Sequence, residues 1–230
     1  MQKIIKWLDN FWYHYKWRVI VISFFLVVFL VCAVQCASKV DADVNLIYVG
    51  PEVVSGEAYF EMENILASRL EGDTNRDGER KVQITDVVVL SDEQLAEKKA
   101  EAEAEDDYLY YDTSVRASAF NNAKNWMVSG EMLICILDPY AYSWFEGLEL
   151  FVPLSEYLDE VPEYAYDEYC LVFAETPFAK YFDAMDPIAE DTLLCLVKPT
   201  YLASFNGNNK DERYEAHIAL IRKMVEFSVE

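Results

Sequence analysis

Four oxygen-bearing side chains at alternate positions could bind a metal ion. They are Asp73, Asn75, Asp77 and Glu79, and Gly78 stands between the last two. Oxygen ligands at positions 1, 3 and 5, glycine at 6 and a backbone carbonyl at 7 form the front half of an EF-hand-type calcium loop. These four residues are therefore candidate ligands of a weak structural calcium site.

The same residues also fit a plain turn between a helix and a strand. Position 12 of the loop should supply a bidentate glutamate, and it is Ile84. Asp, Asn and Gly favour turns because they hydrogen-bond locally or tolerate left-handed backbone. The turn remains the alternative to calcium, and we expect no other cofactor.

Cysteine could supply a second kind of chemistry. Cys170 and Cys195 lie in apolar runs and could form a disulfide if those runs are neighbouring strands outside the cytoplasm. Two buried free thiols are the alternative. Cys135 lies in a buried-strand pattern, Met132–Leu137, and reads as a small core residue. The chain has no CxxC and only two histidines, so we expect no zinc site.

The sequence contains no set of residues that fits nucleophilic catalysis. The two histidines are His14 and His217, and neither has a partner set of nucleophile and second base. Neither a GxSxG nor a Walker-type loop occurs. Acidic residues are so frequent that a pair of them does not by itself indicate a glycosidase. We expect that the protein is not an enzyme.

An apolar run determines where these candidates lie. Residues 19–34 are apolar except for Ser23, and the extension to Ala37 gives 19 residues, roughly 28 Å of helix, close to the thickness of a bilayer core. Four cations and one anion precede the run, so the N-terminus should be cytoplasmic. A cleaved signal peptide or a lipoprotein is the alternative, but residues 33–37 offer only a poor cleavage site. We expect an uncleaved signal-anchor.

The predicted anchor divides the chain into three parts. Residues 1–18 form a cytoplasmic tail rich in aromatic and basic side chains, residues 19–37 contact the lipid bilayer, and residues 38–230 form an extracytoplasmic domain. Of the 19 Lys and Arg and 41 Asp and Glu, four and one lie before residue 38, so the remainder has 15 and 40 and a net charge of −25. Nucleic acid is a poor partner for such a surface.

The elements of this acidic domain alternate. Strands are predicted at 43–49, 82–90, 132–137, 170–173 and 193–197, and helices at 57–70, 114–128, 140–145, 155–158 and 211–229. Ser91 and Gln94 form a capping box that opens a polar helical insertion at about 92–112. Within it, Tyr108 to Tyr111 favours an edge strand, with a contact patch as the alternative. The alternation predicts an α/β fold: a three-layer sandwich with a mainly parallel, mixed sheet and a late antiparallel strand.

The sequence around the third predicted strand resembles a known family. The run Met132–Pro139, the aromatic segment 140–145, Gly147-Leu148 and the segment 151–158 follow in this order. This order resembles type 2 extracellular solute-binding proteins, in which a buried strand ends at the binding cleft and a helix and a Pro-Leu segment follow. The late helix, from Asn208, is also similar. The resemblance covers residues 42–229, implies a reduced, single-lobe relative, and carries over no ligand residue.

We therefore expect a single-pass, membrane-anchored extracytoplasmic binding or interaction module that resembles a reduced solute-binding lobe. Its expected partner is a transporter or another envelope membrane protein. The alternative is a structural or assembly protein that recruits partners through its membrane helix and its outer domain. A deep aromatic pocket at the carboxyl ends of the strands would favour ligand binding, and an apolar patch on a flat acidic surface would favour assembly.

Overall fold

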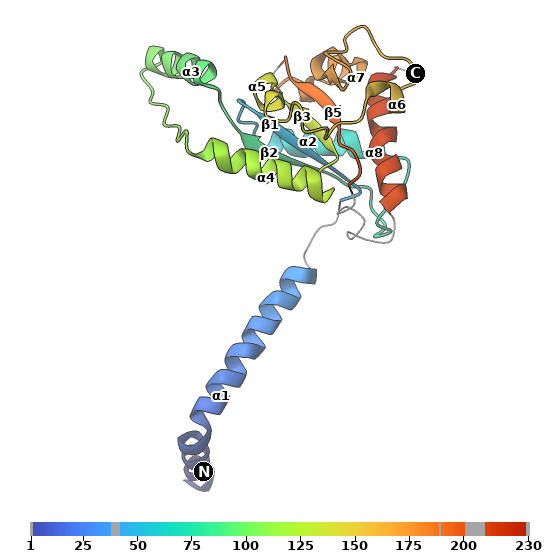
Figure 1. Cartoon of the computed structure of the whole chain (residues 1–230). Coiled ribbons are helices and arrows are strands. Elements are labelled where there is room, and N and C mark those ends of the chain that lie inside the picture. Colours follow the sequence, from blue (N-terminus) through green and yellow to red (C-terminus); the bar gives the residue numbers. More distant parts are fainter. Residues whose placement is uncertain (1, 38–41, 189, 201–209, 229–230) are drawn as a thin grey trace. The chain divides into compact units, whose positions relative to one another are not determined.

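The computed structural model describes residues 2–37, 42–188, 190–200 and 210–228. The chain separates into two compact units, Met1–Asp41 and Ala42–Glu230 (Figure 1).

The first unit consists of one long helix, α1, at Gln2–Ala37. Within its segment Phe11–Val34, an 18-residue window reaches a mean hydropathy of 2.7, so the described chain has one helix long and apolar enough to cross a membrane. The helix begins well before residue 19, because the aromatic tail continues it without a break. The predicted anchor at 19–37 is therefore the carboxyl half of α1.

The second unit contains five strands and further helices. The strands are β1 (Val44–Gly50), β2 (Val82–Val88), β3 (Ile134–Leu137), β4 (Cys170–Val172) and β5 (Leu193–Leu196). The helices are α2 (Gly56–Ala67), α3 (Asp92–Ala104), α4 (Val115–Ser129), α5 (Pro139–Ser143), α6 (Leu154–Tyr157), α7 (Pro177–Tyr181) and α8 (Lys210–Val225). Two 3-10 turns, Phe173–Glu175 and Asp183–Met185, flank α7.

The strands form one mixed sheet in the order β2-β1-β3-β5-β4. β1 is parallel to both β2 and β3, whereas β5 is antiparallel to β3 and to β4. Four strands therefore run in one direction and only β5 is reversed. This confirms the predicted mixed sheet and its late antiparallel strand.

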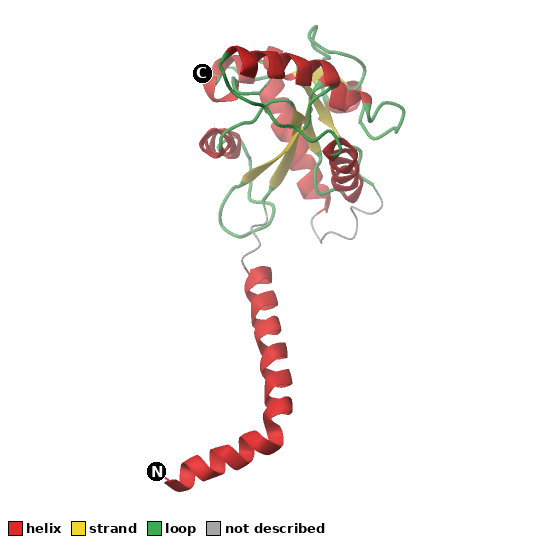
Figure 2. Cartoon of the chain, turned by 90° about the vertical axis from the view of Figure 1, so that its left-hand side faces the viewer, coloured by secondary structure: helices red, strands yellow, loops and turns green. Residues whose placement is uncertain are grey.

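Both faces of the sheet are covered by apolar side chains. Alternate residues of a strand point to opposite faces, and along β1 Leu46 and Tyr48 enter one buried cluster while Ile47 and Val49 enter the other. The first cluster includes side chains of α2 and α8, and the second includes side chains of α4 and α5. Helices accordingly lie on both sides of the sheet (Figure 2).

The predicted insertion is a helix followed by irregular chain. α3 buries only Leu95, and its capping box is present, with both the Ser91 and the Gln94 side chain bonded to backbone. The prediction of an edge strand at Tyr108 to Tyr111 was wrong, because residues 107–112 have no regular secondary structure. The Tyr111 hydroxyl instead accepts a hydrogen bond of 3.2 Å from the Leu90 amide, just beyond β2.

Candidate functional site

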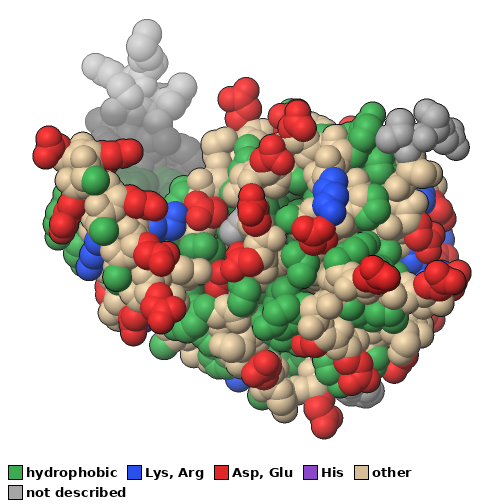
Figure 3. Space-filling view, turned by 90° about the horizontal axis from the view of Figure 1, so that it is seen from above, with side chains coloured by type: hydrophobic (Ala, Val, Ile, Leu, Met, Phe, Trp, Pro, Cys, Tyr) green, Lys and Arg blue, Asp and Glu red, His purple; other side chains and the backbone are tan. Residues whose placement is uncertain are grey.

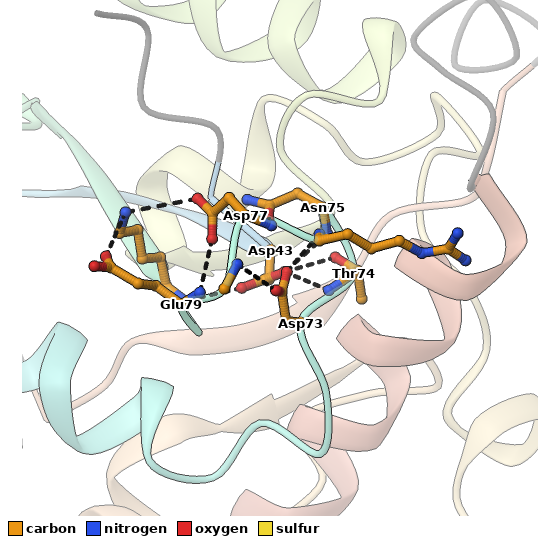
Figure 4. A network of polar contacts seen from close by, with 9 residues as sticks. Asp43, Asp73, Thr74, Asn75, Asp77 and Glu79 are labelled. Atoms are coloured by element: carbon orange, nitrogen blue, oxygen red, sulfur yellow. Dashed lines mark hydrogen bonds and ion pairs between the residues drawn. The ribbon is translucent and has the colours of Figure 1, made fainter.

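The acidic segment from residue 73 to 79 folds back on its own backbone. Asp73 accepts hydrogen bonds from the amides of Arg76 (2.5 Å) and Gly78 (2.7 Å). Asn75 and Asp77 each accept one from the amide two residues later. Arg76 and Gly78 have positive φ angles of 62° and 94°, as expected where side chains close tight turns. Figure 4 shows these contacts.

Asp43 anchors this loop from the start of β1. Its fully buried carboxylate accepts hydrogen bonds from the Thr74 amide (2.5 Å), the Thr74 hydroxyl (2.9 Å), the Asn75 amide (3.2 Å) and the Lys81 amide (2.8 Å). Sequence reasoning missed this role and took Asp43 only as the first residue of a strand. The loop is therefore fixed to the amino end of the parallel strands (Figure 4).

Calcium binding by this loop would depend on the side-chain oxygen atoms that the hydrogen bonds above do not use. Lys81 lies 2.7 Å from a Glu79 oxygen and 3.6 Å from an Asp77 oxygen. The hydrogen bond from the Glu79 amide lowers the pKa of Asp77, so this carboxylate is ionised at neutral pH. In the described chain, no three His, Cys, Asp or Glu side chains converge as a metal-ligating group. The turn accounts for the geometry, and calcium binding stays a prediction.

His217 lies beside the same end of β1. Its Nε2 accepts a hydrogen bond from the Asn45 amide (3.3 Å), and its Nδ1 lies 2.7 Å from the Arg213 carbonyl oxygen, which can only accept. The ring is therefore neutral with the proton on Nδ1. Burial lowers the pKa of His217 to about 4. This histidine is a fully buried structural group rather than an accessible base.

Cys135, Cys170 and Cys195 are fully buried free thiols on β3, β4 and β5. Cys170 and Cys195 are directly opposite each other on neighbouring strands, as the disulfide hypothesis requires. Cys135 is opposite Cys195 on the other side of β5. The structure therefore brings together the predicted pair and a third thiol that the sequence did not connect with them.

At the opposite end of the sheet, the carboxyl ends of β1 and β3 are adjacent. The chain leaves β1 toward α2 on one face and leaves β3 toward α5 on the other. The Asp138 amide donates a hydrogen bond of 2.8 Å to the Val49 carbonyl oxygen and joins the two strand ends. Such a reversal of direction is where open α/β sheets commonly bind ligands.

Asp138 holds the helices around this point. One carboxylate oxygen accepts from the Tyr140 amide (2.8 Å) and caps α5, and the other accepts from Gln94 Nε2 (2.8 Å). Burial raises the pKa of Asp138, and the negative charge of Asp191 raises it further. Because both oxygens are bonded within the protein, the group positions α3 and α5 and is not a free base.

Beside Asp138, the Tyr48 ring closes the end of β1. Its hydroxyl accepts a hydrogen bond of 3.3 Å from the Glu52 amide. A Cβ atom on Gly50 would lie 2.5 Å from the Tyr48 hydroxyl oxygen, so only glycine fits there. Lys98 of α3 lies 3.1 Å from both carboxylate oxygens of Glu52. The space directly above the strand ends is thus filled by side chains.

A groove opens instead next to this point, between α4 and α5. It has a volume of about 380 Å³ and is lined by Arg116, Ala117, Phe120, Tyr140 and Trp144. The Trp144 ring meets Phe120 and Tyr140 edge-on, with centroid distances of 5.9 and 5.2 Å. The lining is therefore mainly aromatic, with Arg116 as its charged group.

Cations flank the rings of this aromatic groove. Arg116 Nη1 lies 2.7 Å from an Asp92 oxygen on α3, and its guanidinium lies 5.9 Å from the centre of the Tyr111 ring. Lys124 Nζ lies 5.3 Å from the centre of the Phe120 ring. Sequence reasoning missed the groove, because none of its residues forms a local motif.

A second, more polar hollow of about 770 Å³ lies at the carboxyl ends of α2 and α8. Its cations have structural partners: Arg80 and Lys223 donate to the Leu70 and Arg69 carbonyl oxygens, and Arg69 lies between the Phe182 and Phe227 rings. These contacts hold the chain just after α2 against the side chains of Arg80 and Lys223, so the hollow has a structural explanation.

Comparisons of this chain with protein-family models, with curated proteins and with solved structures found no match.

Proposed function

We propose that this protein is a single-pass, membrane-anchored interaction module that binds a partner protein through the aromatic groove and has no catalytic role. The observation that carries the proposal is the groove between α4 and α5, beside the carboxyl ends of β1 and β3. The proposed partner is a transporter subunit or another envelope membrane protein.

The charge distribution supports an outer location for the second unit. The apolar run of α1 at 19–34 follows a basic tail, and Lys and Arg are retained on the cytoplasmic side of membranes. We therefore place residues 1–18 inside, the anchor in the membrane and residues 38–230 outside.

The aromatic lining of the groove and the acidic surface of the domain favour a protein over an enclosed small molecule. Seen from above, where α3 and α5 lie, acidic side chains are spread over this face and hydrophobic side chains are exposed between them (Figure 3). Exposed apolar surface with a polar rim is typical of protein contact sites. A partner segment with apolar side chains complements the rings, and Lys or Arg on the partner complements the acidic surface beyond Arg116 and Lys124.

The order of elements supports the relation to solute-binding proteins. β3 is buried at all four residues, and Asp138 and then α5 follow it directly. Pro153 then leads into α6. We propose that this unit is a reduced solute-binding lobe with a three-layer α/β sandwich, since helices and buried clusters occur on both faces of the sheet.

The experiment is affinity purification from detergent of the full chain and two arginine variants. Ala117 is exposed and lines the groove, so Ala117→Arg places a long charged side chain in the groove without removing a core residue. Asn122→Arg is the matched control, because it makes the same charge change at an exposed position on the same helix outside the groove.

We expect the same co-purified membrane proteins with wild type and Asn122→Arg, and a loss of at least tenfold with Ala117→Arg. Thermal unfolding of all three proteins checks that they fold equally. Equal recovery with Ala117→Arg overturns the groove as the contact surface. Recovery of envelope-assembly proteins that depends only on residues 1–37 supports the alternative function, an assembly protein that recruits partners through α1.

A further inference from the structure

Three thiols lie in one row across neighbouring strands of the sheet. Cys135 of β3 is in register with Cys195 of β5, and Cys195 is in register with Cys170 of β4. All three belong to the same buried cluster on one face of the sheet. Cys195 is therefore the central thiol, with a neighbour on either side.

The hydrogen bonds show how Cys170 faces Cys195. The Cys170 amide donates to Asp167 Oδ1 (2.9 Å), and its carbonyl oxygen accepts from the Tyr166 amide (2.9 Å), so both groups point away from β5. Three pairs further along, the Phe173 amide donates to the Thr192 carbonyl oxygen (2.8 Å). Since hydrogen-bonded and non-hydrogen-bonded pairs alternate in an antiparallel ladder, Cys170 and Cys195 form a non-hydrogen-bonded pair.

Cys135 and Cys195 are related differently. The Val197 amide donates to the Leu133 carbonyl oxygen (2.8 Å), two residues along the same ladder. By the same alternation, Cys135 and Cys195 form a hydrogen-bonded pair. The two neighbours of Cys195 are thus not equivalent.

The two kinds of pair differ in the distance between their side chains. Opposite Cβ atoms are about 4.5 to 5.5 Å apart, and the shorter distance belongs to non-hydrogen-bonded pairs. A disulfide needs a Cβ separation of about 3.5 to 4.5 Å. Only the pair of Cys170 and Cys195 reaches this range without a movement of the backbone.

We propose that Cys170 and Cys195 are joined by a disulfide in the mature protein and that Cys135 stays a thiol. The inference rests on the proposed outer location. Each of the two thiols loses a proton, the sulfur atoms form one S–S bond, and the two released electrons reduce the disulfide of a thiol oxidant to its dithiol. Since both sulfurs are buried in the folded domain, this exchange takes place during folding.

The test is peptide mapping of the full chain taken from cells whose thiols are blocked with N-ethylmaleimide at lysis. The protein is purified in detergent, denatured with N-ethylmaleimide present, and cleaved after glutamate without reductant. Such cleavage separates the three cysteines, because glutamates stand between them at 146, 168, 175 and 190. Cys135→Ala is the matched control, because it removes an equally buried neighbour of Cys195.

We expect one linked peptide pair containing Cys170 and Cys195, an alkylated Cys135, and the same link in Cys135→Ala. A link to Cys135, or alkylation of both Cys170 and Cys195 in an outer domain, overturns the proposal. Protease treatment of intact cells reports the location separately. If the domain is protected from the protease and its cysteines are reduced, the proposed outer location is wrong. Oxidation of the purified full chain by glutathione disulfide then tests the cysteine pairing. Failure of Cys170 and Cys195 to join under these conditions overturns the proposed disulfide.

Discussion

The two ends of the parallel strands use a buried aspartate in different ways. At the amino end, Asp43 accepts four hydrogen bonds from the loop and the chain that follows it. At the carboxyl end, Asp138 accepts from one amide and one side chain and holds two helices beside an open aromatic groove. The acid-rich end is closed by its own contacts, whereas the surface suited to a partner lies at the end with fewer local motifs.

Removal of Asp43 is the strongest test of this difference. Asp43→Ala removes the buried carboxylate that accepts hydrogen bonds from several amides. We expect a loss of about 4 kcal/mol in unfolding free energy. Asp73→Ala should cost only about 1 kcal/mol, because water can reach the amides that Asp73 accepts from. Urea unfolding of the two variants measures both. Equal losses would mean that Asp43 is not the anchor of the loop.

A pH titration probes the same amino end through His217. Its pKa of about 4 in the folded protein lies below the usual 6.5, so the unfolded chain takes up the proton first as the pH falls. The stability contributed above pH 6.5 is therefore lost between about pH 6.5 and 4, by about 3 kcal/mol. We expect His217→Gln to show a flatter dependence of unfolding free energy on pH in this window. If the slope of unfolding free energy against pH is the same in His217→Gln as in wild type, the pH dependence does not come from the protonation of His217.

Asp138 provides the matching test at the carboxyl end. Asp138→Ala removes the cap of α5 and the acceptor of Gln94, and we expect a loss of about 2 kcal/mol. The loss should be smaller than for Asp43, because the carboxylate has fewer partners and its raised pKa shows that burial disfavours its charge. Gln94→Ala, which removes one of these bonds, should cost about 1 kcal/mol. If Asp138→Ala lowers the unfolding free energy more than Asp43→Ala does, the comparison between the two ends of the strands is reversed.

Calcium gives the smallest expected effect. If Asp73, Asn75, Asp77 and Glu79 form a weak site, saturating calcium should stabilise the domain by roughly 1 kcal/mol, as binding to the folded state alone requires. Calorimetric titration and thermal unfolding of the full chain in detergent measure the heat and the shift. Asp77→Asn should abolish both. The absence of heat and shift in wild type leaves the turn as the complete account of the loop.

Local and buried patterns could be predicted from the sequence. The runs around Ile47, Cys135 and Cys195 are apolar at consecutive positions because both faces of their strands are covered, and such runs indicate central strands. The capping box of Ser91 and Gln94 was predicted because all its atoms lie within four residues. The helix predicted at 114–128 is α4, and Gly130 caps it with a φ of 74°.

Contacts between distant segments could not be predicted. Phe120 meets Trp144 only because α4 and α5 pack on the same face of the sheet. The contact between Asp43 and Thr74 joins residues 31 positions apart. The aromatic run 108–111 was predicted to be an edge strand, yet in the described chain it pairs with no strand, and the Tyr111 hydroxyl accepts a hydrogen bond from the Leu90 amide. A hydrophobic pattern carries no information about which neighbour is available.

The position of β1 has a mechanical consequence. The anchor segment is continuous in sequence with β1, which is paired along its length with β2 on one side and with β3 on the other. A partner held at the groove, beside the carboxyl ends of the strands, would pull against the anchor along the strand axis. Such a load shears many ladder hydrogen bonds at once instead of opening them one by one. In the proposed function, β1 would carry the tension between the membrane and the partner, and the resistance of the domain would be set by the rate of forced unfolding.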